Sequence, residues 1–322
     1  MDSELIEQLR SGEFRSGESL GAALGISRAA VWKRIERLAE VGLDVERVRG
    51  KGYRVPGGIQ MLDAPALNQQ LAGVLPVDVV LSTGSTNADA LAMLQRGVAA
   101  PFALLAEHQT AGRGRRGRAW MSPFAGNVYL SLAWQFPVGA SRLEGLSLAV
   151  GVVLAEALTD AGLGSRVALK WPNDVWVEGA KIAGVLIELS GDLDDRCTAV
   201  IGIGINGRLA ESAGATIDQP WTDYFRETGI ALDRNALVHD LLCRQVALLQ
   251  QYSDQGFAAW RERWQALDAL AGKPVIVTTA VATAEGLAAG IDANGALCLQ
   301  TAAGITVFHG GEASLRLRPA GK

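Results

Sequence analysis

The stretch GRGRRGR at residues 112–118 places four arginines among three glycines. Glycine lets a backbone approach a ligand closely, and arginine supplies permanently charged donors that pair with phosphate oxygens. The apolar residues 102–105 precede this run, and the largely apolar residues 127–132 follow it. We therefore predict a loop between two buried strands that holds an anion, rather than a flexible RNA-binding tail.

Other β-like runs extend these two strands into a sheet. They cover residues 78–83, 102–107, 127–134, 166–171, 181–189 and 197–206. Helices are expected between and after them. SRLE at residues 141–144 has capping-box spacing and should open an apolar helix toward Asp160. A further helical stretch runs from Arg234 to about Leu267. This alternation predicts a mixed α/β catalytic core over residues 62–270.

Residues 1–58 predict a winged helix-turn-helix. Helices are expected near residues 5–9, 19–24 and 28–39, the last of them capped by Ser27. Residues 45–55 alternate around a Gly-Lys-Gly turn, which is typical of a two-stranded wing. Basic residues concentrate on the third helix and the wing, where they could reach DNA phosphates. The predicted DNA-binding residues are Ser27, Arg28, Lys33, Arg34, Arg37, Arg47, Arg49 and Lys51. The alternative is a small helical domain with a solvated basic face.

The last segment, residues 271–322, reads as a small β-barrel domain. Short strands are expected at residues 274–281, 286–291, 297–301 and 305–309, with a hairpin turn at Asn294-Gly295. The whole chain is thus expected to be an α+β protein of three domains.

Composition limits the cellular setting. The 322 residues carry a formal net charge of −4, so the protein does not coat nucleic acid along its whole length. The three cysteines have no disulfide or metal-ligand spacing, which fits a reducing compartment. The N-terminus does not read as a signal peptide, and the longest apolar run, residues 145–155, is short for a bilayer span. We therefore expect a cytoplasmic protein without a membrane partner.

Two segments after the arginine run carry further charged groups. In KWPND, residues 170–174, the proline forces a turn after a strand and leaves Asn173 and Asp174 at its mouth. The carboxylate of Asp174 could coordinate Mg²⁺ together with substrate phosphates. Lys181 opens an apolar strand, where it could neutralise reacting anions or merely extend its ammonium to solvent.

Two weaker motifs contain small residues. TGSTN at residues 83–87 lies at a strand end and leads into a helix, so its hydroxyl and amide groups suit N-capping or recognition of a neutral polar ligand. GIGIN at residues 202–206 places glycines within a strand, which indicates either close ligand approach or a bulge.

Taken together, these motifs resemble the bifunctional biotin protein ligases that also repress biotin operons. The likeness runs through SRAAVWK at 27–33, GKGY at 50–53, QTAGRGRRGR at 109–118, KWPND, KIAG at 181–184, GIGIN, and GGEASLR at 310–316. The resemblance implies a catalytic domain of the biotin/lipoate ligase type and a C-terminal SH3-like β-barrel.

The resemblance also implies a two-step reaction and its partners. Biotin's carboxylate attacks the α-phosphate of ATP, giving biotinyl-5′-adenylate and pyrophosphate, with Mg²⁺ as a cofactor. A lysine of the biotin carboxyl carrier protein of acetyl-CoA carboxylase then displaces AMP. The adenylate acts as corepressor, and an adenylate-dependent homodimer binds double-stranded operator DNA.

Site residues are carried over by motif. The predicted biotin-binding residues are Ser85, Thr86, Asn87, Gln109, Arg113, Gly114, Arg115 and Lys181. The predicted ATP- or adenylate-binding residues are Arg115, Arg116, Arg118, Lys170, Asn173, Asn206 and Trp221. Lys181, Arg115 and Asp174 are the predicted catalytic residues. Two alternatives stay open: a ligase whose DNA-binding domain no longer regulates, and a lipoate-type ligase on the same fold.

Overall fold

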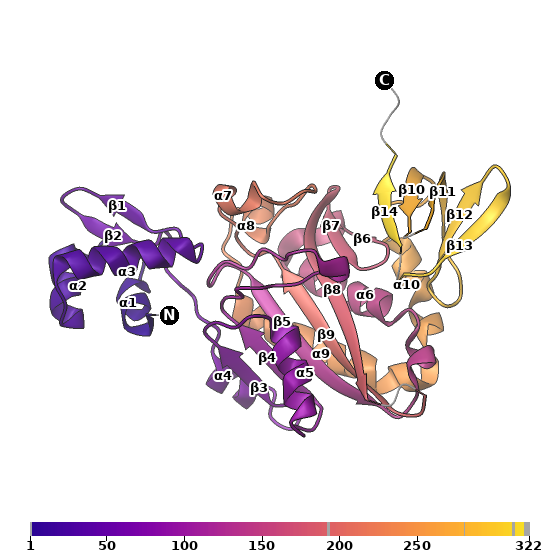
Figure 1. The fold of residues 1–322 in the computed structure, drawn as a ribbon, viewed down its shortest axis with the longest axis horizontal. Helices are drawn as coiled ribbons and strands as arrows, with labels where there is room; N and C mark the ends of the chain where they lie inside the picture. Colours follow the sequence, from indigo (N-terminus) through magenta and orange to yellow (C-terminus); the bar gives the residue numbers. More distant parts are fainter. Residues whose placement is uncertain (1, 192–193, 280, 311–312, 319–322) are drawn as a thin grey trace.

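Three parts of the chain follow one another along the molecule (Figure 1). The computed structural model describes residues 2–191, 194–279, 281–310 and 313–318. The N-terminal helices and hairpin lie at one end, a five-stranded sheet lies at the other, and a seven-stranded sheet lies between them. The α+β organisation predicted from the sequence is confirmed.

The N-terminal part is a three-helix domain with a small hairpin. Its elements are α1 (Ser3–Leu9), α2 (Gly17–Leu24), α3 (Arg28–Glu40), β1 (Glu46–Val48) and β2 (Gly52–Arg54). Ser16 and Ser27 cap α2 and α3, because each hydroxyl accepts a backbone N–H of the first turn. Val31, Ile35 and Leu38 of α3 are buried, at the helical spacing expected of an inward face. The predicted winged helix-turn-helix is confirmed.

The central sheet has its strands in the order β3-β4-β5-β9-β8-β7-β6. β3 runs parallel to β4, and the other neighbours are antiparallel. The strands are β3 (Val77–Val80), β4 (Phe102–Ala106), β5 (Val128–Phe136), β6 (Val167–Lys170), β7 (Asp174–Val177), β8 (Ala180–Gly191) and β9 (Cys197–Ile205). All six predicted strands are present. β7 was not predicted, because its four residues directly follow the Pro-Asn turn.

Helices cover both faces of this sheet. They are α4 (Ala64–Gln70), α5 (Thr86–Gln95), α6 (Leu146–Leu158), α7 (Glu211–Gly214), α8 (Tyr224–Thr228), α9 (Arg234–Gln255) and α10 (Arg261–Ala266). Ile201, Ile203 and Ile205 of β9 join the main core with α6 and α9. Because strand side chains alternate, Gly202 and Gly204 face the opposite side, where α5 packs.

The predicted capping box at the start of the apolar helix is wrong. Residues Ala140–Leu143 form a separate 3₁₀ turn, and α6 begins after Gly145 without a side-chain cap. Gly145 has a φ of 76°, and a Cβ there would lie 2.4 Å from the ring of Phe257. The turn is therefore set by packing against Phe257, a contact that local spacing does not reveal. The second long helix also ends earlier than predicted, because Gly256 and a 3₁₀ turn separate α9 from α10.

One helical stretch has the length and composition of a membrane span. The stretch Ala140–Arg166 comprises α6 and the short helical turns on either side of it, and its 27 residues exceed the 11-residue apolar run seen in the sequence. However, 67% of its most apolar window is buried inside the protein. Burial against the sheet and α9 is the pattern of a core helix.

The C-terminal part is a five-stranded antiparallel sheet. Its order is β13-β12-β11-β10-β14, formed by β10 (Pro274–Thr278), β11 (Thr283–Ile291), β12 (Leu297–Thr301), β13 (Gly304–Phe308) and β14 (Ser314–Leu317). The predicted turn at Asn294-Gly295 joins β11 to β12, with Gly295 at a φ of 83°. The indole N–H of buried Trp171 donates to the Gly295 carbonyl at 3.0 Å, which ties this small β domain to the central one.

A buried ion pair fastens the segment between the N-terminal and central domains. Arg234 at the start of α9 lies 2.6 Å from Glu107 at the end of β4, and their side chains are 3% and 0% exposed. The other carboxylate oxygen of Glu107 accepts the Leu62 backbone N–H at 2.6 Å, and Arg234 also donates to the Gln60 carbonyl. The segment around Gln60 and Leu62 is therefore held by Glu107 and Arg234, and Glu107 lies two residues before Gln109 in the chain.

Replacing Arg234 with alanine is expected to lower the free energy of unfolding of the central domain by about 3–5 kcal/mol, because Glu107 is left buried without its countercharge. Urea unfolding followed by tryptophan fluorescence measures the loss. Arg10→Ala is the matched control: its ion pair with Glu7 is exposed, so the change should stay below about 1 kcal/mol. Equal losses in the two variants would contradict the role of burial.

Candidate active site

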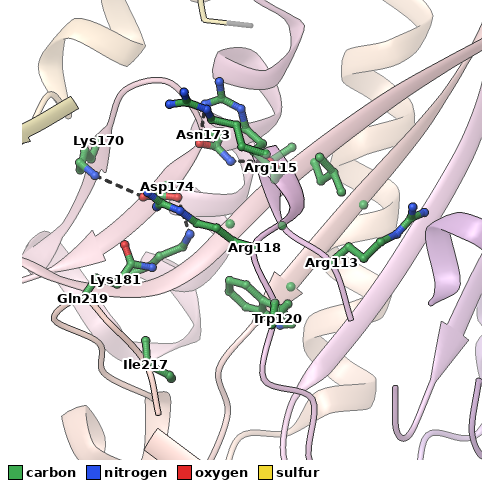
Figure 2. A pocket seen from close by; sticks show the side chains of 18 of the residues that line it. Arg113, Arg115, Arg118, Trp120, Lys170, Asn173, Asp174, Lys181, Ile217 and Gln219 are labelled. Atoms are coloured by element: carbon green, nitrogen blue, oxygen red, sulfur yellow. Dashed lines mark hydrogen bonds and ion pairs between the residues drawn. The ribbon is translucent and has the colours of Figure 1, made fainter. Parts of the chain in front are cut away.

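The arginine run is a loop at the edge of a cavity of about 660 Å³. It connects β4 to β5, as predicted, and closes on itself where Gly114 N–H donates to the Arg118 carbonyl at 2.8 Å. Arg116 has a φ of 58°, so the loop bends sharply within its short 3₁₀ turn. Figure 2 shows the arginine side chains spreading in different directions, with Arg113 pointing away from Arg115 and Arg118.

Two strand glycines make room for large groups on the cavity wall. A Cβ on Gly204 would lie 2.5 Å from the ring of Trp120, and one on Gly202 would lie 2.3 Å from Asn87 Oδ1. The alternating glycines of GIGIN therefore serve close side-chain approach rather than a bulge. Trp120 follows the arginine run, and the Lys181 ammonium lies over its ring, 5.2 Å from the centroid.

A compact charged cluster lies where β6, β7 and β8 adjoin. Lys181 Nζ is 2.6 Å from Asp174 Oδ1, and Lys170 Nζ is 3.5 Å from Asp174 Oδ2. Burial lowers the pKa of Lys170, and the neighbouring Lys181 lowers it further, while Asp174 opposes both effects. Figure 2 places these three side chains together, with Arg118 extending toward them. The structure thus brings Lys181 beside KWPND.

Arg115 links the loop to two other parts of the chain. Its guanidinium donates to Asn173 Oδ1 at 3.2 Å, to Ala313 O at 3.4 Å, and to the Gly310 carbonyl. Burial lowers its pKa, and the nearby Asp174 raises it. One arginine therefore joins the loop, the Pro-Asn turn and the C-terminal domain.

The hydroxyl and amide groups at the start of α5 form a network beneath the cavity surface. Gln109 Oε1 accepts the Thr86 backbone N–H at 2.9 Å, and Gln109 Nε2 donates to Ser122 Oγ at 3.0 Å. Ser85 stands at the N-cap position without a side-chain capping bond, so capping does not explain this motif. Asn87 is engaged with protein groups: Leu186 O, Glu188 and Ser131.

Most of the predicted biotin and nucleotide residues line this one cavity; Asn206 and Trp221 do not. Asn206 is buried and donates to the Thr222 carbonyl at 3.0 Å, and Trp221 donates to the Gly214 carbonyl at 3.0 Å. Both side chains are thus engaged in hydrogen bonds within the segment that follows β9. The guanidinium of Arg226 covers the Trp221 ring at 3.8 Å.

The structure adds two wall segments that contain none of the predicted site residues. Residues 216–220 lie beside Lys181, where Figure 2 shows Ile217 and Gln219. Residues 313–317 reach the cavity from β14 and bring Arg316 with them. Two signals in the sequence pointed to them: residues 209–219, where the resemblance places a nucleotide lid without a residue-by-residue match, and the closing motif GGEASLR, whose Gly311 and Glu312 lie outside the described residues.

The predicted metal ligand Asp174 does not fit a resident cation site. Its two carboxylate oxygens already face two ammonium groups, which would repel Mg²⁺. Within the described ranges, no group of three or more His, Cys, Asp or Glu side chains could hold a metal ion.

The basic face of the N-terminal domain is largely free for a ligand. Arg28, Lys33 and Arg37 on α3 are exposed, as are Arg47, Arg49 and Lys51 on the wing. Two predicted DNA-binding residues have structural tasks: Ser27 caps α3 through the Ala30 N–H, and Arg34 pairs with Asp2 at 2.9 Å.

Family models match all three parts of the chain. An HTH domain matches residues 3–54, the biotin/lipoate A/B protein ligase family matches residues 79–206, and the biotin protein ligase C-terminal domain matches residues 271–316. The chain is also 42% identical to bifunctional ligase/repressor BirA of Escherichia coli, over 97% of this chain and 96% of that protein. This chain belongs to the biotin protein ligase family.

Other members of the family agree with this assignment. Bifunctional ligase/repressor BirA of Salmonella typhimurium is 42% identical over 97% of this chain and 96% of its own length. The biotin protein ligase of Aquifex aeolicus, solved in complex with biotin and ATP, has a TM-score of 0.65 and 28% identity. That alignment covers 75% of this chain and 99% of the Aquifex chain.

Proposed function

We propose that this biotin protein ligase activates biotin with ATP and transfers it to a lysine of the biotin carboxyl carrier protein of acetyl-CoA carboxylase. The charge of the cavity carries the proposal. Its acidic lining residues are Asp174 and Asp218, and its cationic ones are Arg113, Arg115, Arg116, Arg118, Lys170, Lys181 and Arg316. Such a wall suits a reaction that brings a carboxylate against phosphates, because the two anions otherwise repel each other.

The biotin ring is assigned to the neutral part of the wall. Ser85, Thr86 and Gln109 offer hydroxyl and amide groups there, and Arg113 and Gly114 of the loop lie on the same cavity. Asn87 is assigned a supporting role, because both N–H groups of its amide donate to protein acceptors, Glu188 and the Leu186 carbonyl, whereas Gln109 Nε2 donates a single bond among the described residues, to Ser122. Asn87 is therefore not among the residues that we propose to contact the biotin urea directly.

The reacting groups are assigned to the charged part of the wall. Lys181 would neutralise biotin's carboxylate while a carboxylate oxygen forms a bond to the α-phosphorus and pyrophosphate departs. Arg115, Arg116 and Arg118 would hold the resulting phosphate, with Lys170 and Asn173 on the nucleotide side. In the second step the carrier lysine's nitrogen bonds to the biotinyl carbonyl and AMP leaves. Asp174 keeps Lys181 in place between the steps.

Because Asp174 is already paired, we assign the required Mg²⁺ to the phosphates of ATP rather than to a carboxylate site of the protein. Mg²⁺ commonly binds through substrate phosphates and retains several waters. It would offset phosphate charge there, while the arginines and lysines of this chain fix the phosphate position.

Mass spectrometry of a carboxyl carrier domain tests the ligase. The domain is incubated with the protein, ATP, Mg²⁺ and either biotin or lipoate. A mass increase of one biotinyl group, dependent on ATP, is expected. Modification with lipoate instead of biotin would favour a lipoate-type ligase, and an unmodified carrier with both acids would refute the ligase assignment.

We propose that the same protein represses biotin biosynthesis genes, with biotinyl-5′-adenylate as corepressor. The exposed cations of α3 and the wing would meet phosphates of the operator. Two copies are needed to contact a two-half-site operator, so we infer an adenylate-dependent homodimer that acts in the cytoplasm. The proposed domain limits are residues 1–58, 62–270 and 271–322.

Lys33→Ala is expected to reduce the salt dependence of operator binding by about 0.9 in the slope of log K against log salt, because one phosphate contact is lost. Fluorescence anisotropy of a labelled operator duplex, with biotin and ATP present, measures the slope. Carrier biotinylation by Lys33→Ala should match wild type, since Lys33 lies on α3 and does not line the cavity. If the wild-type protein shows no salt-dependent binding to the operator duplex, the repressor proposal is contradicted and the protein is a ligase that does not regulate.

A further inference from the structure

Four polar side chains form a continuous chain behind the cavity wall. Glu188 comes from β8, Asn87 and Thr86 from α5, and Ser131 from β5. Ser131 is fully buried, and Thr86 and Asn87 are 4% and 3% exposed. Ser131 does not line the cavity itself, whereas Thr86 and Asn87 do. The chain therefore connects groups inside the protein to the surface that a ligand meets.

The orientation of the Asn87 amide is fixed by its neighbours. Its Nδ2 donates to Glu188 Oε2 at 2.8 Å and to the Leu186 carbonyl at 3.3 Å. Both neighbours are acceptors, so rotating the amide by half a turn would set oxygen against oxygen. Gly202 leaves the space in which this amide lies. Asn87 Oδ1 consequently faces Ser131.

Ser131 has one proton and two oxygen neighbours. Its Oγ lies 2.6 Å from Asn87 Oδ1 and 2.8 Å from Thr86 Oγ1. An amide oxygen can only accept, so the Ser131 proton belongs to the bond with Asn87. In the contact between the two hydroxyls, Thr86 must then be the donor and Ser131 Oγ the acceptor. The alternative acceptor for that proton, Gln109 Oε1, is farther away at 3.3 Å and already accepts the Thr86 backbone N–H.

The direction of these bonds determines what Thr86 presents to a ligand. Its hydroxyl proton is committed to Ser131, so the oxygen can offer only lone pairs to the cavity. A ligand N–H would be bound at this position, and a ligand oxygen would be left without a donor.

We propose that Ser131, oriented by Asn87 and Glu188, is a specificity-determining residue that makes Thr86 an obligate acceptor and selects a ligand carrying an N–H group. This inference rests on the proposed function, in which that N–H belongs to the ring urea of biotin. Ser131 is a positioning residue, because it acts through Thr86 rather than by touching the substrate.

The test compares biotin with its two carbamate analogues, in which one or the other ring N–H is replaced by oxygen. Carrier biotinylation gives kcat/KM for each acid. Wild type should reject at least one analogue by tenfold or more, since a buried acceptor loses its donor. In Ser131→Ala the Thr86 hydroxyl can turn and donate to the carbamate oxygen. The ratio of biotin to that analogue should then fall at least tenfold, with the change mainly in KM.

A second variant keeps the shape of the site. In Glu188→Gln the side-chain amide can donate to Asn87, which removes one of the two acceptors that fix the Asn87 amide and lets the bond direction reverse in part of the molecules. The same ratio should fall, although less than in Ser131→Ala. The variant also weakens the 3.6 Å ion pair of Glu188 with Arg113, an effect that should act on all acids alike and by itself leave the ratio unchanged. Thr159→Val is the control, because among the described residues that hydroxyl bonds only to the Ala155 carbonyl on α6, and Thr159 does not line the cavity. Its ratio should equal that of wild type.

The outcomes separate the two proposals. If the wild-type chain does not ligate biotin, the proposed function fails, and this inference fails with it. If wild type ligates biotin but accepts both analogues equally well, Thr86 is not an obligate acceptor and the inference alone is overturned. It is also overturned if Ser131→Ala and Glu188→Gln lower kcat/KM for all acids by the same factor, because that is the behaviour of a purely structural residue.

Discussion

Replacing Lys181 with alanine is expected to slow biotinyl-adenylate formation by about 10²–10³-fold, the usual cost of removing one fixed group that stabilises developing charge. The ammonium is placed by Asp174 at 2.6 Å and by the face of Trp120. Without it, biotin's carboxylate would approach the α-phosphate with its charge uncompensated. Adenylate synthesis is measured by release of pyrophosphate, and transfer by single-turnover labelling of the carrier domain.

Two further variants show whether the loss comes from charge. Lys181→Arg retains a cation and should recover part of the rate. Asp174→Asn should retain more activity than Lys181→Ala, because it removes only the group that positions the ammonium. Near wild-type turnover in Lys181→Ala would sink the assignment of Lys181 to the reacting carboxylate.

The second large effect is expected from Arg115→Gly, which should still make biotinyl-adenylate but release it too early. Charge-assisted hydrogen bonds contribute about 1.5–3 kcal/mol each, so losing one predicts roughly ten- to a hundredfold faster dissociation. The variant also cuts the ties to Asn173 and to the Gly310 and Ala313 carbonyls. The loop should therefore close less firmly over the intermediate.

Dissociation is followed by chasing labelled adenylate from the protein with unlabelled biotin and ATP. Arg142→Gly, an exposed arginine outside the cavity wall, should retain the adenylate as wild type does. Unchanged retention in Arg115→Gly would remove this arginine from the phosphate site. If retention is lost equally in Arg115→Lys, the planar guanidinium and not the charge alone is required.

Local sequence patterns predicted the elements that carry the site. Alternation of isoleucine and glycine in β9 places the isoleucines on the core face and the glycines on the opposite face, and this can be read from period two alone. The arginine run between two apolar strands could likewise only be a loop. Where tertiary packing overrides local spacing, prediction failed: Phe257 sets the start of α6 through Gly145, more than a hundred residues earlier in the chain.

The pairing of charged groups could not be predicted from spacing. Lys170 and Asp174 are four residues apart, yet it is the antiparallel register of β6 and β7 that sets them opposite each other. Asn206 and Trp221 were expected near the nucleotide. In the structure, both side chains instead form hydrogen bonds within the segment that follows β9. The resemblance places a nucleotide lid within residues 209–219, but the irregular sequence there does not show which of these residues reach the cavity.

The sequence by itself determined the order of the three domains, the strands of the catalytic sheet and the arginine loop, because these depend on local periodicity and on the turn chemistry of glycine and proline. Only the tertiary structure decided which groups meet across that sheet. Arg115 reaches the C-terminal domain, Asp174 lies between two lysines, and Ser131 connects Thr86 to Glu188. Each of these contacts joins residues far apart in the chain or set opposite by strand register, and hydrogen bonds and ion pairs depend on distances that only the folded sheet fixes.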